Sequence, residues 1–376
     1  MTKRKTAPLL LLLLLSLLFS TATQLATPSA AAAEQASRDF SSTIAKARKA
    51  VKASLAEHDA PGLTVAVMVG GEIVWSEGFG MSDLENGVPV RPHTKMRIGS
   101  VSKSLTSAAV GLLYEQGKLD LDAPVQKYVP SFPKKRYPIT ARQLGGHLAG
   151  IRSYLPGERS EMFNTRRFDS VAAGLELFQA DPLLFEPEEK YSYSSHGFNL
   201  LSAVVEGASG KGFLAYMQEN VFDPLGMTDT TADHTDQVIP HRTRFYERND
   251  AGTWENAPYV DNSYKWAGGG FISTAEDLLR FGLGIFGGGL LQSETLELLL
   301  TPQRTNDGKS TGYGIGWRTT TDDQGRRRVG HGGGSVGGKA QFVIYPDSNV
   351  ILAMMINTGS LDLGELPFEI AGLFVE

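Results

Sequence analysis

The sequence predicts an α/β fold in which strands from both ends of the chain form one sheet and helices lie between them. Two valine-rich alternating runs follow residue 62, and further strand-like runs follow residue 312. The segment between these ends has mainly the pattern of helices and loops. We therefore expect one α/β domain built from residues 34–137 and 267–376, with a mainly helical region, residues 138–266, inserted into it.

The N-terminus has the pattern of a secretory signal peptide. Three basic residues, 3–5, precede an apolar run, 9–19, and small side chains at Ala31 and Ala33 favour cleavage near Ala33. A membrane span needs about 20 apolar residues, and this run is shorter. We expect residues 1–33 to be removed, which leaves a secreted or periplasmic protein with no stable membrane anchor.

Composition limits the chemistry that the chain can carry out. The 376 residues include no cysteine, which excludes disulfides, a thiol nucleophile and thiolate metal sites. The net charge is −5, and the expected leader would take three positive charges with it. An acidic protein is a poor partner for nucleic acid or anionic lipid, so we expect neither as its ligand.

The first elements follow from hydrophobic periodicity. Residues 40–57 carry apolar side chains at helical spacing, and the two alternating runs after them meet at Gly70-Gly71, which predicts a helix and then a hairpin. Residues 101–116 repeat apolar side chains every three or four positions up to Gly117. This pattern predicts a buried helix that ends at that glycine.

The later elements are predicted in the same way. The clearest helix of the middle region is "HGFNLLSAVVEGASG", and Ser273 with Glu276 forms an expected capping box before another helix. Residues 363–374 form the last helical pattern. The strand-like runs of the C-terminal part are "YGIGWR", "RRRVGHG", "KAQFVIYP" and "NVILAMMIN".

A serine and a lysine lie three residues apart at the start of the predicted 101–116 helix. One helical turn would bring the amine of Lys103 to the hydroxyl of Ser100, and a serine needs a base to act as a nucleophile. Burial and the helix N-terminus would both lower the lysine pKa. The spacing also arises by chance, as at Ser131 and Lys134 in an expected surface loop, and by itself it fits a solvated helix start equally well.

Two further segments favour a catalytic site. Tyr193 lies in a short polar turn before an apolar helix, and a phenol beside a positive charge can relay protons. His331 ends a strand and is followed by three glycines. A glycine-rich strand edge lets a substrate lie close to the backbone and offers free amides.

The order of these motifs resembles that of the serine β-lactamase and penicillin-binding-protein superfamily. Serine-x-x-lysine comes first, then a tyrosine motif, then lysine or histidine followed by x-glycine. The chain is similar to the class C β-lactamase-like group, peptidase family S12, and "RIGSVSKSLTSAAVGLLYEQGKLDLDAPVQKYVPSFP" with "HLAGIRSY" most resembles its LACTB-like branch of serine peptidases. The resemblance implies a β-lactamase/transpeptidase-like fold, an antiparallel sheet flanked by helices with an all-helical region inserted and the site between them.

The resemblance also implies a role for each motif residue. Ser100 would be the acylated nucleophile, Lys103 its base, and Tyr193 the group that passes the proton to the leaving group. The backbone amides of Ser100 and Gly334 would form the oxyanion hole. No metal and no cofactor is implied.

Two positions depart from the family pattern. Ser195 stands where most relatives have an asparagine that binds the substrate, and a hydroxyl is shorter and offers only one donor proton. His331, with Gly332 and Gly333, stands where many relatives have lysine-threonine-glycine. It lacks the fixed charge and the hydroxyl that bind a β-lactam carboxylate, so both changes favour peptides, amides or esters over β-lactams.

Other matches lack the structural context that they need. Residues 333–337 fit a nucleophile elbow, but a strand rather than a helix follows them. His147 has no second ligand at metal-binding spacing, so we expect it to hold a turn.

We therefore expect a secreted serine hydrolase that forms an acyl-enzyme on Ser100 and cleaves peptide, amide or ester bonds, as a D-alanyl carboxypeptidase, an aminopeptidase or a LACTB-like endopeptidase does. A carboxylesterase or a true β-lactamase is the alternative within the same chemistry. An alternative of another class is a protein without turnover, either a penicillin- or peptide-binding sensor or a scaffold, since the LACTB relative forms filaments. The expected partners are a small peptide, amide, ester or β-lactam substrate and, in an oligomer, further copies of the chain.

Overall fold

The computed structural model describes residues 1–2, 39–155, 157 and 161–375. The predicted signal peptide, residues 1–33, therefore lies almost wholly outside the described residues. The contacts group the chain from Arg38 to Glu376 in one compact unit, and the predicted division of this unit at residues 138 and 266 stays a prediction. Among the described helices, none is long and apolar enough to cross a membrane.

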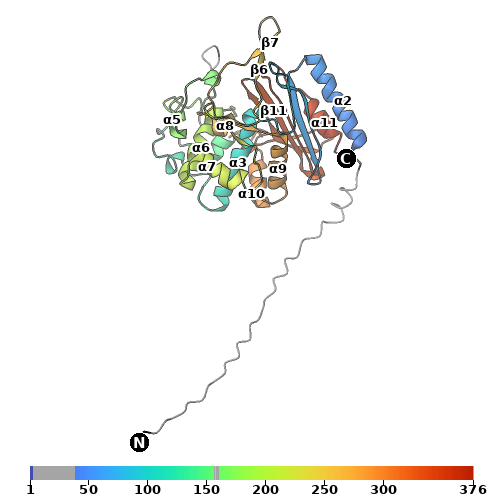
Figure 1. The fold of residues 1–376 in the computed structure, drawn as a ribbon. Coiled ribbons are helices and arrows are strands. Elements are labelled where there is room, and N and C mark those ends of the chain that lie inside the picture. The colour runs from blue at the N-terminus through green and yellow to red at the C-terminus, as the bar shows by residue number, and fades with distance from the viewer. Residues whose placement is uncertain (3–38, 156, 158–160, 376) are drawn as a thin grey trace. The chain divides into compact units, whose positions relative to one another are not determined.

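A seven-stranded antiparallel sheet forms the centre of the unit (Figure 1). Strands from both ends of the chain pair in it, with Ala66 opposite Ala353, as the sequence predicts. The order across the sheet is β3 (Val88–Pro89), β2 (Glu72–Asp83), β1 (Gly62–Val69), β12 (Val350–Ile356), β11 (Gly338–Tyr345), β10 (Arg327–Ser335) and β9 (Arg318–Thr321).

Helices cover both faces of this sheet (Figure 1). The outer face carries α2 (Ser41–His58) and α11 (Leu366–Gly372), and the inner face carries α3 (Ser102–Glu115), α9 (Ala275–Phe286) and α10 (Ser293–Leu300). Alternate residues of one strand enter the two layers, because side chains of a strand point to opposite faces. Leu352 packs in the outer layer, whereas Ile351 and Ala353 pack in the inner one.

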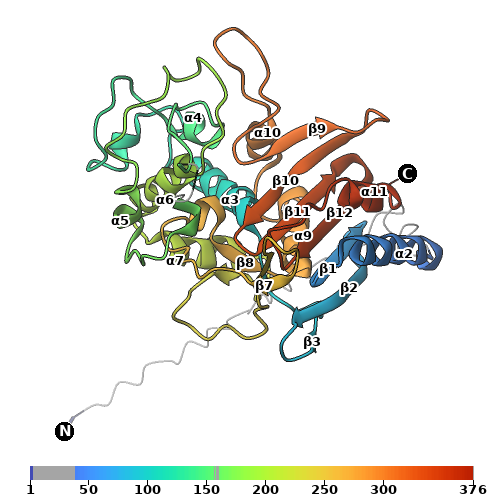
Figure 2. The same cartoon turned by 90° about the horizontal axis from the view of Figure 1, so that it is seen from above.

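The middle of the chain forms the remaining elements beside the inner face. Figure 2 shows α5, α6 and α7 grouped on one side, with α3 between them and the sheet. The helices are α4 (Ala141–Gly145), α5 (Val171–Leu175), α6 (Ser195–Ser209), α7 (Phe213–Met217) and α8 (Trp266–Gly269), with short 3₁₀ turns η2 (Val125–Lys127) and η3 (Glu161–Phe163) and the π-helical segment η4 (Gln218–Phe222). A further 3₁₀ turn, η5 (Pro346–Ser348), joins β11 to β12 of the central sheet. Short strands form a three-stranded sheet, β4 (Met96–Arg97), β8 (Phe271–Ser273) and β5 (Thr231–Ala232), and a hairpin, β6 (Tyr246–Arg248) and β7 (Trp254–Asn256).

The predicted first helix and hairpin are confirmed, while two later boundaries were wrong. The helix α9 is capped by Thr274, whose hydroxyl accepts the Asp277 amide, and not by a Ser273–Glu276 box. Ser273 is instead the last residue of β8, where its hydroxyl bonds that of Thr230. Because Ser273 belongs to a strand, the cap of α9 lies one position later than predicted.

The predicted strand "YGIGWR" is also wrong, except for its last residue. Arg318 begins β9, but the preceding residues form a turn in which Gly312 and Gly316 have φ angles of 66° and 79°. A left-handed φ breaks an extended backbone. Ile315 and Trp317 leave this turn into the inner core instead.

Candidate active site

Ser100 lies in the short 3₁₀ turn η1 (Gly99–Val101), one turn before α3 rather than within it. The preceding strand β4 pairs with β8, which fixes where the turn begins. Gly99 has a φ of 48°, and a Cβ on it would lie 2.6 Å from the Gly334 carbonyl oxygen. Only glycine therefore allows the nucleophile turn to approach β10 this closely.

Lys103 lies in the first turn of α3 with its side chain fully buried. Its Nζ is 3.0 Å from the Ser100 Oγ, 3.1 Å from the Ser195 Oγ and 2.5 Å from the Gly268 carbonyl oxygen. The predicted serine–lysine pair is thus in direct contact. The other serine–lysine match has exposed side chains at Ser131 and Lys134.

The surroundings of Lys103 favour a neutral amine. Burial lowers its pKa well below the usual value, and the positive charges of Lys265 and Arg318 lower it further. A neutral amine has a lone pair that can accept the proton of the Ser100 hydroxyl. This is the property that a general base for a serine nucleophile needs.

Tyr193 stands beside this pair, just before α6. Lys103 Nζ lies 4.8 Å from the centre of the Tyr193 ring. Burial raises the pKa of Tyr193 above its usual value, although a hydrogen bond with Ser100 acts in the opposite direction. The phenol is therefore protonated at neutral pH and can donate a proton.

His147 holds the loop that carries Tyr193. Its Nδ1 accepts the Ser194 amide at 3.1 Å, and its carbonyl oxygen accepts the Ser192 amide at 3.0 Å. Its ring centre is 4.2 Å from that of Tyr193. Burial lowers the pKa of His147 well below the usual value, so the ring is neutral and can accept the amide proton.

Ser195 begins α6 and faces Lys103. Its hydroxyl accepts from Lys103 Nζ and also bonds the Tyr154 hydroxyl. Burial raises the pKa of Tyr154 to about 12. The short serine side chain is thus part of the contact between the base and a second tyrosine.

His331 lies in β10 with only 2% of its surface exposed. The Tyr313 hydroxyl donates to its Nε2 at 2.8 Å, and its Nδ1 donates to the Gly332 carbonyl oxygen at 2.6 Å. Burial lowers its pKa to about 3. The imidazole is therefore neutral. Its ring centre lies 6.2 Å from that of Tyr193. The catalytic role predicted for His331 stays a prediction.

The glycines after His331 run along the nucleophile turn. A Cβ on Gly333 would lie 1.9 Å from the Ile98 carbonyl oxygen and 3.1 Å from the Ser100 amide nitrogen. A Cβ on Gly99 would lie 2.7 Å from the Gly334 nitrogen. The two amides predicted as the oxyanion hole thus lie on adjoining segments, and the roles of Gly332, Gly333 and Gly334 stay predictions.

Comparisons with known proteins identify the family of the chain. The sequence matches the Beta-lactamase family over residues 47–369. The chain belongs to this family. It is 34% identical over 439 residues to the serine beta-lactamase-like protein LACTB, mitochondrial, of Homo sapiens, with 89% of this chain and 80% of the relative covered. The penicillin-binding protein 4* of Bacillus subtilis (strain 168) is 26% identical, with 78% and 67% covered.

Solved structures show the family fold. A penicillin-binding protein from Bacillus halodurans superposes with a TM-score of 0.72 at 27% identity and covers 85% of this chain and 97% of its own. The octameric penicillin-binding protein homologue from Pyrococcus abyssi has a TM-score of 0.76 at 23% identity, with 88% and 77% covered. The predicted family and the β-lactamase/transpeptidase-like fold are confirmed.

Several groups at the site of this β-lactamase family member were missed from sequence. They are the Tyr154 hydroxyl, the Gly268 carbonyl and the cations of Lys265 and Arg318. Lys265 carried a signal, because a charged residue within "SYKWAGGG" is surrounded by aromatic residues and glycines. The Gly268 carbonyl carried none, since every residue has a backbone carbonyl.

Proposed function

We propose that the chain is a serine hydrolase that forms an acyl-enzyme on Ser100 and then hydrolyses it. The observation that carries this proposal is the 3.0 Å contact between the Ser100 Oγ and the Nζ of a lysine whose pKa is lowered by burial. Lys103 meets no carboxylate among the residues that the structure describes, and a buried lysine without such a partner is otherwise destabilising. Its position next to a serine therefore supports a catalytic role.

The proposed reaction begins when Lys103 takes the proton of the Ser100 hydroxyl. The Ser100 Oγ attacks the substrate carbonyl carbon, and the amides of Ser100 and Gly334 donate to the oxygen that becomes negative. Tyr193 passes a proton to the leaving nitrogen or oxygen and regains one from Lys103. Water then enters the place of the leaving group and gives up its proton along the same route, which frees Ser100.

The proposed substrates are peptides, amides or esters. A D-stereospecific amidohydrolase from a Streptomyces species shares the fold with a TM-score of 0.72 at 24% identity. The neutral imidazole of His331 offers no charge to a β-lactam carboxylate, which makes β-lactamase activity a second candidate. Carboxylesterase activity is the other candidate with the same chemistry. A penicillin-binding sensor without turnover is the candidate of another class, since relatives carry the name penicillin-binding protein.

The test is intact-mass spectrometry of the protein after exposure to a fluorophosphonate and, separately, to a penicillin. We expect a fluorophosphonate adduct on Ser100 that is absent from Ser100→Ala. A lasting penicillin adduct would favour the sensor, and rapid release of opened penicillin would favour a β-lactamase. No adduct from either reagent would contradict the hydrolase and favour a scaffold.

Two further properties are proposals. We propose that the protein is exported and cleaved near Ala33, which N-terminal sequencing of the protein from its native host would test. We also propose that it forms oligomers, because a homologue of the same fold is described as octameric. Light scattering after size-exclusion chromatography would measure the assembled mass.

A further inference from the structure

Lys265 is a second buried lysine at the candidate site. It directly precedes α8, and 3% of its surface is exposed. Within the described ranges, its ammonium has no hydrogen-bond acceptor and no ion-pair partner. The Nζ atom itself keeps some accessible surface, but a largely buried cation loses much of its hydration with no charge partner to compensate.

The ammonium of Lys265 lies among groups of the catalytic site. Its Nζ is 5.8 Å from the centre of the Tyr154 ring and 5.5 Å from that of Tyr264. Tyr154 in turn bonds Ser195, which accepts from Lys103. The charge of Lys265 reaches Lys103 directly, since it lowers the pKa of that amine.

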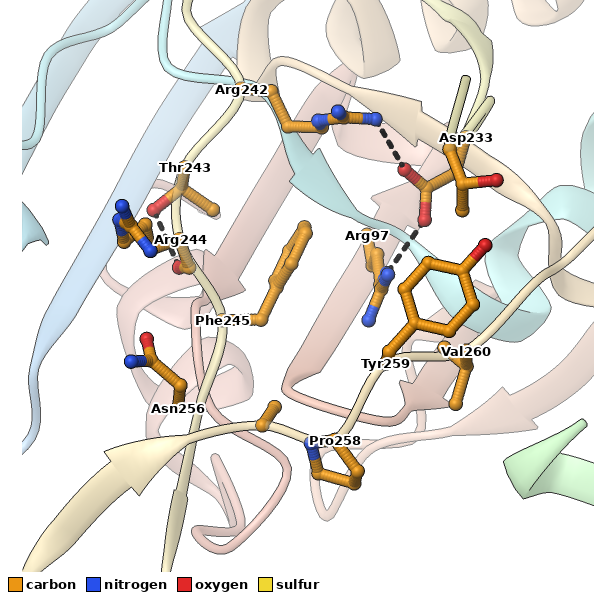
Figure 3. Close-up of a pocket in the computed structure, with 12 residues that line it drawn as sticks. Arg97, Asp233, Arg242, Thr243, Arg244, Phe245, Asn256, Pro258, Tyr259 and Val260 are labelled. Carbon is orange, nitrogen blue, oxygen red and sulfur yellow. Dashed lines mark hydrogen bonds and ion pairs between the residues drawn. The ribbon is translucent and has the colours of Figure 1, made fainter. Parts of the chain in front are cut away.

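Asp233, the carboxylate whose charge acts on Lys265, already has other partners. Asp233 pairs with Arg97 at 2.7 Å and with Arg242 at 3.3 Å, and it accepts from the Asn262 amide at 2.9 Å. Figure 3 shows the two arginines turned toward this carboxylate beside a cavity of about 430 Å³. Asp233 therefore raises the pKa of Lys265 only partly, and burial with the charge of Arg97 holds it at about 7.

The other charged groups at the site show the same pattern, in which carboxylates already have partners and some of the described cations have no carboxylate partner. Glu161 is held by Arg152 at 2.8 Å and by His196 at 3.0 Å. Arg318, an exposed residue of β9, adds a positive charge that also lowers the pKa of Lys103. Within the described residues, Lys265 and Arg318 thus have no carboxylate partner, while Asp233 and Glu161 already pair with other groups.

We infer that Lys265 is a specificity-determining residue whose ammonium binds an anionic group, a carboxylate, of the substrate that acylates Ser100. The inference rests on the proposed function. A carboxylate would give the buried ammonium the partner that the described part of the chain does not provide, and charge-assisted hydrogen bonds are among the strongest in proteins. Lys265 would then provide the positive charge for a substrate carboxylate that the neutral His331 does not offer.

The test compares anionic and neutral esters at pH 7 in Lys265→Met and Lys265→Arg. In one arm the carboxylate lies in the acyl group: the anionic substrate is a glutaryl nitrophenyl ester and the neutral substrate is a pentanoyl nitrophenyl ester. In the other arm the carboxylate lies in the leaving group: the same acyl group is esterified to 3-hydroxybenzoate in the anionic substrate and to phenol in the neutral one. We expect Lys265→Met to lower the ratio of anionic to neutral kcat/KM roughly 10- to 100-fold in one arm, and Lys265→Arg to retain most of it.

The ratio separates this role from an effect through Lys103, which would change both esters alike. Lys190→Met is the matched control, because Lys190 is exposed with its ammonium 5.1 Å from the Phe185 ring, and we expect it to change neither ester. If Lys265→Met lowered kcat/KM equally for the anionic and the neutral ester in each arm, or if the wild-type protein preferred the neutral esters, the inference would be overturned. Fluorophosphonate labelling of Ser100 reports the proposed function separately, since that reagent carries no carboxylate.

Discussion

The two faces of the central sheet differ in what their buried residues do. On the outer face, alternate residues of β1 and β12 pack with α2 and α11 as an apolar layer that includes Val65 and Leu352. On the inner face, α3 buries polar side chains completely, among them Lys103, Ser104 and Ser107. The outer layer requires volume and apolar character, whereas the inner layer requires particular hydrogen bonds.

The buried hydroxyls of α3 show how the inner face positions the site. Ser104 donates to the Gly316 carbonyl at 2.8 Å, and Ser107 donates to that of Ile315 at 2.5 Å. Thr106 donates to the Ala267 carbonyl at 3.1 Å. These contacts fix the helix against the chain next to Gly268, and so they fix where the Lys103 amine lies.

Among the changes that test this difference between the two faces, Lys103→Met should have the largest effect, because it removes the proposed base from the inner face. We expect kcat/KM to fall roughly 10²- to 10⁴-fold, the range for a lost general base, with no loss of folding stability. The measurement is hydrolysis of a nitrophenyl ester together with urea unfolding. A variant that keeps wild-type turnover would show that the inner face holds Lys103 for a structural reason.

Leu352→Ala makes the opposite change on the outer face. Truncating a fully buried leucine should lower the free energy of unfolding by about 2–5 kcal/mol, through lost burial and the cavity left behind. Because the side chain points away from the site, kcat/KM of the folded protein should stay within about twofold of wild type, the range of a change without a transition-state contact. A tenfold loss of turnover at full folding would mean that the two faces are coupled.

The same contrast explains what could be predicted from the sequence. The outer layer was predictable, because alternating strands and the 41–58 helix follow hydrophobic periodicity. The Ser100–Lys103 contact was also predictable, since one helical turn joins the two residues. The turn at Gly316 was not, because "YGIGWR" alternates like a strand and only packing against α3 bends it.

The site residues that were missed have no signal in hydrophobic periodicity. Lys265 acts on Lys103, and Tyr154 on Ser195, from segments far apart in sequence that only the tertiary fold brings together. The neutral state of His331 was equally hidden. It follows mainly from the burial of the ring, whose Nε2 meets the hydroxyl of Tyr313, a residue 18 positions earlier in the chain.

A smaller effect should appear in the pH dependence of stability, where a buried lysine of the inner face can be measured by itself. Burial lowers the pKa of Lys265 to about 7, while an unfolded lysine titrates near about 10.4. Between these values the unfolded state binds more protons, so wild-type stability rises with pH. Lys265→Met removes this rise.

The variant should therefore be more stable than wild type by about 1–3 kcal/mol at pH 7, in line with buried charges replaced by apolar groups, and the gain should fade by about pH 10.4. Urea unfolding at pH 7, 8.5 and 10 measures it. Lys190→Met provides the control, since that lysine is exposed. A gain that does not change with pH would show that packing, rather than charge, is responsible.

The smallest effect concerns a helix cap on the inner face, which should affect stability but not turnover, as residues of the outer face do. Thr274 caps α9 by accepting the Asp277 amide at 3.2 Å. Thr274→Ala should cost about 1 kcal/mol of stability and leave turnover unchanged, because the cap contacts no group of the site. Thr274→Ser should retain the stability, since serine caps as well as threonine does. If Thr274→Ala and Thr274→Ser lowered the free energy of unfolding by the same amount, the threonine methyl group rather than its hydroxyl would stabilise the helix. Particular hydrogen bonds would then be required only in α3 and in the residues that contact Lys103.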